Sequence, residues 1–153
     1  MASHVWTVLC RKASIDRESN VVSLLEVIES IQITAPTASN PPLAVPIQLE
    51  IVTLWARSDP GRPERASARF SLHFPDGTQV EGSRSEVNLM DWQRLRTVIQ
   101  MQGFPVKGPG IHHIVIQSRQ DDGSAWTEVA KIPIEIAIIA ATAVTPAAAP
   151  STH

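Results

Sequence analysis

The chain has 153 residues, a single cysteine, no tyrosine and a formal net charge of −2. This length predicts one domain, which can bury roughly 70% of the surface that its unfolded chain exposes. One cysteine excludes a disulfide framework and a cysteine-based zinc site, and the balanced charge argues against nucleic acid as a partner, because nucleic-acid binding relies on clustered lysine and arginine.

The sequence carries no sign of export or membrane insertion. Its first residues, MASH, are not the basic and then apolar segment of a signal peptide. The most apolar segment, Ile132–Val144, is interrupted by Pro133 and Glu135 and is shorter than the roughly 20 residues that span a bilayer. We therefore expect a cytoplasmic protein that does not contact the membrane.

In chain order, runs that alternate between apolar and polar side chains predict a series of β-strands. The expected strands are Val5–Cys10, Val45–Arg57, Ala68–Phe74, Thr78–Gly82 and Leu95–Met101. Segments 11–20, 34–43 and 83–91 predict connections, the last with a short helical turn, because they are polar, rich in proline or without a clear period. Asp76-Gly77 predicts a tight hairpin turn, and a change of phase near Thr53 predicts a β-bulge.

Residues Val21–Ile33 fit two interpretations. Apolar side chains recur at helical spacing through the segment, and Asn20 could cap such a helix. The same residues fit a long strand, because valine and isoleucine favour strands and crowd the segment. We predict a single long strand, since the surrounding elements are all β.

Two apolar runs, Ile111–Ser118 and Trp126–Ile138, flank the turn sequence Asp121-Asp122-Gly123-Ser124. Both runs alternate with period two. His112 should therefore share a face with the isoleucines of the first run, and Trp126 should share a face with Ile132, Ile134 and Ile136 of the second. This pattern predicts an antiparallel hairpin inside a larger sheet.

About eight strands, frequent turns and no strong helix predict an all-β fold, an antiparallel β-sandwich formed by residues 1–139. Residues 140–153 are rich in alanine, threonine and proline, and predict a poorly packed tail.

Several motifs give the chain a family resemblance. In order they are Val8-Leu9-Cys10, Leu24-Leu25, Asn40-Pro41-Pro42-Leu43, Phe74-Pro75-Asp76-Gly77 and the Pro-Gly-x-His-x-Ile strand of residues 109–114. With these motifs the chain resembles, over nearly its whole length, a family of small bacterial β-sandwich domains of unknown function. Members often carry an aromatic residue in place of His112 and a glycine in place of Glu26. The resemblance implies a strand for Val21–Ile33 and implies no activity.

Few residues suggest a chemical site. His112 and His113 are adjacent, so on a strand they point to opposite faces and cannot bind one ion. We expect His112 to be buried and bonded to a neighbour, and His113 to be solvated. Cys10 lies beside Arg11 and Lys12, which would lower its pKa, but it lacks a positioned base, so a small buried residue is the simpler interpretation.

Turn aspartates are the candidates for a calcium site, because calcium prefers six or more oxygen ligands. They are Asp59, Asp91, Asp121 and Asp122. Their simpler role is to bond their own turns, so we predict no metal ion and no cofactor. A basic face could likewise form from Arg57, Arg62, Arg65, Arg69, Arg94 and Arg96, but balancing acids predict surface ion pairs instead.

The leading functional hypothesis is a non-enzymatic protein-interaction or assembly module, because no nucleophile with a matching base is evident. One alternative is a sandwich that binds calcium or an anionic ligand at charged loops. If the strands run up and down, loops 11–20, 58–64, 84–91 and 119–125 gather that charge at one end, while loops 34–43, 75–78 and 103–110 form the other. A second alternative is a metal-dependent hydrolase, in which His4, His73, His112 or His113 would converge with carboxylates.

A second copy of the chain is the expected partner. Lys131–Ile138 is predicted to be a sheet edge, and exposed edges pair with other chains unless they are protected. Lys131, Pro133 and Glu135 protect its first half, whereas residues 136–143 have no such protection. We predict a homodimer formed by edge pairing or by a face contact, with Phe104, Val106, Ile136 and Ile138 as interface residues.

Overall fold

The computed structural model describes residues 2–35, 43–120 and 123–141. Within these ranges the chain forms nine strands and no helix. The strands are β1 (Ser3–Ile15), β2 (Val22–Val27), β3 (Ser30–Ala35), β4 (Leu43–Ala56), β5 (Glu64–His73), β6 (Gln79–Leu89), β7 (Arg94–Val106), β8 (Gly110–Gln120) and β9 (Thr127–Ala140). A membrane-spanning helix is absent from these described ranges.

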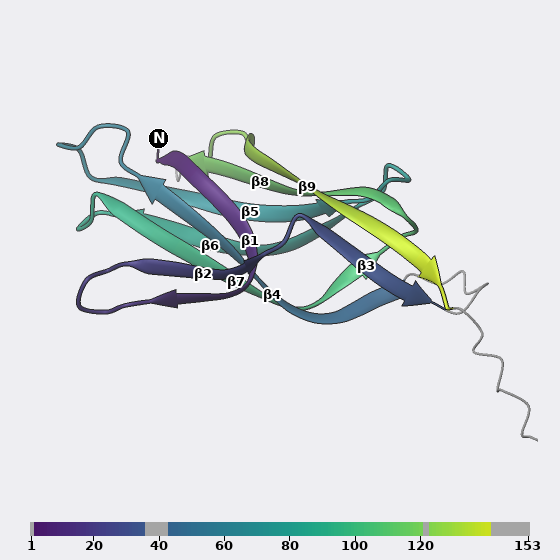
Figure 1. Ribbon diagram of the computed structural model, residues 1–153. Coiled ribbons are helices and arrows are strands. Elements are labelled where there is room, and N and C mark those ends of the chain that lie inside the picture. The colour runs from purple at the N-terminus through teal and green to yellow at the C-terminus, as the bar shows by residue number, and fades with distance from the viewer. Residues whose placement is uncertain (1, 36–42, 121–122, 142–153) are drawn as a thin grey trace, which may run out of the picture.

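The strands form two sheets that pack face to face (Figure 1). One sheet has four strands in the order β2-β1-β4-β7, and the other has five in the order β3-β9-β8-β5-β6. All neighbouring strands are antiparallel except β3, which runs parallel to β9. The predicted all-β sandwich is therefore confirmed.

The core lies between the two sheets and follows the period-two pattern of the strands. On β4, Leu49, Ile51, Thr53 and Trp55 all face inward and are buried. The indole nitrogen of Trp55 donates a hydrogen bond to Thr97 Oγ1 at 3.0 Å, which satisfies its only polar group. The bulge predicted in this strand near Thr53 does not occur in β4, because this inward phase is unbroken; the register shift opposite Leu54 and Trp55 places the extra residue on β1, between His4 and Trp6.

The segment predicted as one long strand is divided between the two sheets. Ile28 N–H donates to the carbonyl of Leu9 on β1 at 2.9 Å, and the next residue's carbonyl, that of Glu29, accepts from Glu135 N–H on β9 at 3.1 Å. The chain thus leaves the four-stranded sheet and enters the five-stranded one between two consecutive residues. Strand was the right choice over helix, but a single strand was wrong.

Just before this crossing, Glu26 has a φ of 53°, in the left-handed region that favours glycine. A glycine at this position would adopt the same φ without the strain that a Cβ causes.

Two predicted connections are partly strands. β1 continues to Ile15, and β6 continues through 83–89, where an irregular segment with a short helical turn was expected. Both extensions are paired: Ile15 with Val22, and Val87 with Ala66. Pairing with a neighbouring strand overrides the weak local pattern of these residues.

The strand order and burial remove most of the surface through which a dimer was predicted. β9 lies between β3 and β8, and β3 pairs with it from Glu135 to Ala140, so the half that was expected to be an unprotected edge is covered by the chain itself. Phe104, Val106 and Ile136 are at most 2% exposed and belong to the core, and of the four predicted interface residues Ile138 alone is exposed. The predicted tail lies mostly outside the described residues.

Candidate functional site

Two β-bulges build a polar surface on the outer face of the five-stranded sheet. The first is on β9, where Ile116 pairs with Ala130 and Gln117 pairs with Glu128, so β9 carries one extra residue. An extra residue reverses the alternation of side chains beyond it. Trp126 therefore points outward, and the prediction that it shares the inner face with the isoleucines of β9 is wrong.

The second bulge is on β6, beside β5. Arg69 pairs with Arg84 and Ser71 pairs with Glu81, so β6 spans one more residue than β5 between these pairs. The inserted segment contains Gly82, where an added Cβ would lie 2.1 Å from the ring of Phe70, so a side chain there would collide with the core. Beyond the bulge Arg84 faces outward, toward Arg69.

Three guanidinium groups surround Trp126 as a result. Their central carbons lie 4.5 Å (Arg69), 4.7 Å (Arg119) and 5.8 Å (Arg84) from the centroid of the indole ring. Cations at such distances are attracted to the ring by about 0.5–1 kcal/mol each when exposed. We call these four residues the arginine–tryptophan surface.

The three arginines differ in what else they contact. Arg69 donates from Nε to Gln117 Oε1 at 2.8 Å and forms an ion pair with Glu81 at 3.0 Å. Within the described ranges, neither Arg84 nor Arg119 has a carboxylate within ion-pair distance. Arg69 is thus held by the protein, whereas the described residues leave the other two with hydrogen-bond donors for an external anion.

A hollow of about 430 Å³ lies between these side chains. Its lining residues are Ser67, Arg84, Ser85, Glu86, Arg119 and Trp126. One atom of a lining residue, Arg119 Nε, is buried and has no hydrogen-bond partner in the described structure. Because buried donors are normally satisfied, this atom marks a place where a bound group would complete the hydrogen bonding.

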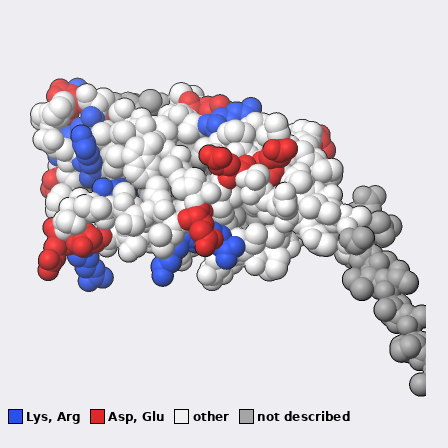
Figure 2. Space-filling view, viewed as in Figure 1, with Lys and Arg blue, Asp and Glu red and all other residues white. Residues whose placement is uncertain are grey.

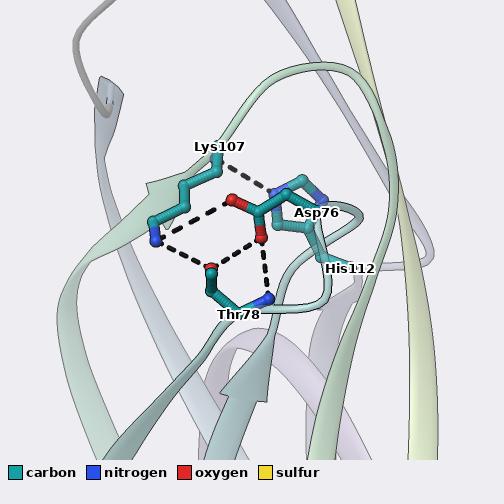
Figure 3. Close-up of polar contacts among 4 residues, drawn as sticks. All are labelled: Asp76, Thr78, Lys107 and His112. Atoms are coloured by element: carbon teal, nitrogen blue, oxygen red, sulfur yellow. Dashed lines mark hydrogen bonds and ion pairs between the residues drawn. The ribbon is translucent and has the colours of Figure 1, made fainter.

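A second polar cluster, at the end of the sandwich where β7 turns into β8, is closed by contrast (Figure 3). Lys107 Nζ donates to Thr78 Oγ1 at 2.7 Å, lies 4.0 Å from Asp76 Oδ2 and sits 4.8 Å from the ring centroid of Phe74. Asp76 Oδ1 in turn accepts from the hydroxyl and the N–H of Thr78, and these bonds lower the pKa of Asp76.

The buried ring of His112 holds this cluster from the side of the core. Its Nε2 accepts a hydrogen bond from the N–H of Lys107, and its Nδ1 lies 3.3 Å from the carbonyl of Gly110. These partners suit a neutral ring protonated on Nδ1. Burial lowers the pKa of His112, and the rings of Phe74 and Phe104 contact it. The expectation of a buried, bonded His112 is confirmed.

Those of the remaining predicted site residues that the structure describes do not converge. Cys10 is fully buried and burial raises the pKa of its thiol, as a buried structural residue requires. Asp59 accepts from Gly61 N–H within its own turn, and Asp121 and Asp122 lie outside the described residues. No group of three metal-ligating side chains occurs in the part of the chain that the structure describes.

One nucleophile-like pair does occur on β5. Ser71 Oγ lies 3.0 Å from His73 Nε2, which is a suitable distance for a serine and its base. Ser71 is only 7% exposed, however, and among the described residues no carboxylate hydrogen-bonds the histidine to orient it. The pair therefore lacks the third member and the access that an acyl-transfer site needs.

Of the six arginines for which surface ion pairs were predicted in place of a basic face, Arg69 forms one, with Glu81, among the described residues. Arg57 donates to the carbonyls of Leu89, Met90 and Pro60, which ties together the loops at one end of the sandwich. Arg96 donates to Asn20 in the β1–β2 turn. These contacts agree with the predicted gathering of the charged loops at one end. In them, however, the arginines hold the loops together through hydrogen bonds.

Sequence reasoning missed Arg84, Arg119 and Trp126 as a group. Arg84 and Arg119 are 35 residues apart along the chain, and Arg119 and Trp126 are 7 apart. Their side chains fall on one face only when both bulges are taken into account. The available signal was a tryptophan beside a turn in a chain with few aromatics.

Comparison with known proteins adds little to this geometry. No family model and no curated protein sequence matches the chain. Among solved structures, it is similar to a β-glucosidase from Listeria innocua in complex with glucose, at 10% identity and a TM-score of 0.47, over 72% of this chain and 15% of that one. It is also similar to the N-terminal domain of PorA, at 16% identity and a TM-score of 0.27, over 87% and 97% of the two chains. Neither likeness carries a functional argument.

Proposed function

We propose that this protein is a non-enzymatic protein-interaction module that binds a short acidic segment of a partner protein at the arginine–tryptophan surface. The observation that carries the proposal is that Arg84 and Arg119 flank Trp126 without an ion-pair partner among the described residues. Guanidinium groups bind carboxylates through two parallel hydrogen bonds, and Trp126 offers an apolar face for the rest of the segment.

The surrounding charges favour a short acidic segment over a nucleic acid. Glu86 lines the hollow, Glu81 pairs with Arg69, and Glu128 lies opposite Gln117 on the neighbouring strand. A continuous phosphate backbone would meet these carboxylates, whereas a few carboxylates can fit between them. The net charge of −2 also gives no long-range attraction for nucleic acid.

Binding of capped hexaglutamate, with capped hexaglutamine as the reference, tests the proposal by calorimetry. We expect the glutamate peptide to bind and the glutamine peptide not to bind, with affinity falling as salt is raised. Replacing Arg84 and Arg119 together by alanine should weaken binding at least about tenfold, because each arginine contact to a carboxylate is worth roughly 1.5–3 kcal/mol.

Arg17→Ala with Arg94→Ala is the matched control, because both arginines are exposed, neither lines the hollow, and their loss changes the net charge equally. Equal weakening by this control, or tighter binding of hexathymidylate than of hexaglutamate, would overturn the proposal.

A small anionic ligand is the second candidate, favoured by the size of the hollow. Its volume of about 430 Å³ lies within the roughly 300–1,000 Å³ of small-molecule sites. Millimolar glutarate, a dicarboxylate, should then raise the melting temperature of the native protein and leave that of the Arg84→Ala, Arg119→Ala variant unchanged. No shift in the native protein would exclude this class of ligand.

A further inference from the structure

The crossing between the sheets leaves two strand edges open on one side of the sandwich (Figure 1). β2 pairs with β1 from Cys10 onward, so within the described ranges the first half of β1 has no hydrogen-bonded strand on that side. β3 pairs with β9 from Glu135 onward, so Thr127–Ile134 has none either. Both open edges follow from the division of one chain segment between two sheets.

A groove of about 540 Å³ lies between these edges. Its lining is mainly apolar and comprises Thr7, Val8, Leu9, Val27, Ile28, Glu29, Ile111, Ile132, Pro133 and Glu135. Val27 and Ile111 are 54% and 53% exposed, which is high for large apolar side chains. Figure 2 looks onto this side, where acidic side chains stand beside a largely uncharged surface.

The edge of β1 offers backbone hydrogen bonds to the groove. The carbonyl of Leu9 points away from β4, because it accepts from Ile28 N–H at 2.9 Å. Alternate residues of a strand direct their backbone groups to the same side, so the N–H and C=O of Thr7 also point into the groove. Within the described ranges neither group has a backbone partner.

The edge of β9 is protected instead. Glu135 N–H points to the β3 side, so the backbone of Pro133 points there too, and proline has no N–H to donate. Natural sheets use proline in this way to prevent pairing at an open edge. An incoming strand would therefore pair with β1 and pack its side chains against β9.

Charge restricts what can occupy the groove. Glu29 and Glu135 line it, and neither forms an ion pair among the described residues. A lysine or arginine in the occupant would complement them. The chain's own residues 142–153 contain neither lysine nor arginine, so they lack this complement.

We propose that this groove binds a short extended segment of a partner protein, with apolar side chains and one lysine or arginine, as an added strand on the open edge of β1. Strand addition supplies affinity through main-chain hydrogen bonds and specificity through alternate side chains. The stretch from Thr7 to Leu9 spans roughly 7 Å at 3.4 Å per residue, so about three or four residues of the partner would pair. The groove shares no lining residue with the hollow beside Trp126, so either site can exist without the other.

A five-residue peptide that alternates valine and threonine around a central lysine, with Gly-Ser at each end, is the probe. We expect it to shift the backbone amide resonances of Thr7 and Leu9, and to bind about tenfold more tightly than the same peptide with central glutamate. Methylating the peptide's backbone nitrogens should abolish binding, because it removes the donors of an added strand without changing the protein.

The variant Glu29→Gln, Glu135→Gln should lose the preference for lysine over glutamate. Both side chains are exposed, so the fold is expected to persist. The control, Glu18→Gln with Glu128→Gln, removes the same charge outside the groove and should keep the preference.

Equal binding of the lysine and glutamate peptides to the native protein would overturn the proposal. So would full binding of the methylated peptide, or light scattering that reports a dimer in which the Thr7 amide is already protected from exchange.

Discussion

Two clusters in this molecule place a cation over an aromatic ring, and they differ in whether the cation's donors are used. Lys107 lies 4.8 Å from the ring centroid of Phe74, and its ammonium group also contacts Thr78 and Asp76. Arg119 lies at nearly the same distance, 4.7 Å, from the ring centroid of Trp126, but has no carboxylate partner among the described residues. The first cluster is complete within the chain, and the second is not completed by the residues that the structure describes.

Stacking of a cation on a ring therefore does not by itself identify a binding site. At the Lys107 end, the polar groups bond to one another within the chain, and the buried His112 holds the loop by a hydrogen bond to Lys107 N–H. At the arginine–tryptophan surface, the buried Nε of Arg119 is left without a partner in the described structure. We expect changes at the first cluster to alter stability and changes at the second to alter binding.

The largest effect is expected for His112→Ala. The variant loses a fully buried ring and leaves the N–H of Lys107 and the carbonyl of Gly110 unpaired, so the free energy of unfolding should fall by about 2–4 kcal/mol. Urea denaturation measures this loss. His113→Ala, at the neighbouring and partly exposed position, should cost less than about 1 kcal/mol. Equal losses would mean that the closed cluster is not held by His112.

A difference within the arginine–tryptophan surface should come next. Arg69→Ala removes a bond to Gln117 and an ion pair with Glu81, and should lower the free energy of unfolding by about 1 kcal/mol. Arg84→Ala removes no such contact and also relieves repulsion among three like charges, so stability should stay within about 0.5 kcal/mol of the native value. Denaturation of both variants under one set of conditions checks the order. A larger loss for Arg84→Ala would assign that residue a structural role.

The smallest effect concerns pH. Burial lowers the pKa of His112, so the unfolded chain, whose histidine titrates near 6.5, takes up a proton more readily than the folded one. The stability contributed by the neutral ring is complete above that value and is lost as pH falls below it. His112→Phe keeps an aromatic ring without a titrating group, so its unfolding free energy should fall less between pH 7 and pH 5. An unchanged slope would contradict this explanation.

The sequence alone determined the class of the fold. Period-two alternation in β4, β5, β8 and β9, with turn residues between them, was enough to predict an all-β sandwich and a buried His112. These features are local, because a side chain's face depends on its neighbours along the same strand. The Asp76-Gly77 turn was predicted for the same reason, and Gly77 has the positive φ of 82° that such a turn needs.

Only the tertiary structure decided which strands are neighbours and where the alternation is interrupted. The division of residues 22–35 between two sheets depends on β1, which pairs with β2, and on β9, which is distant in sequence and pairs with β3. The extra residues in β6 and β9 depend on register with β5 and β8. A single added residue moves every side chain beyond it to the other face, and this is why Arg84 and Trp126 could not be placed beside each other from sequence alone.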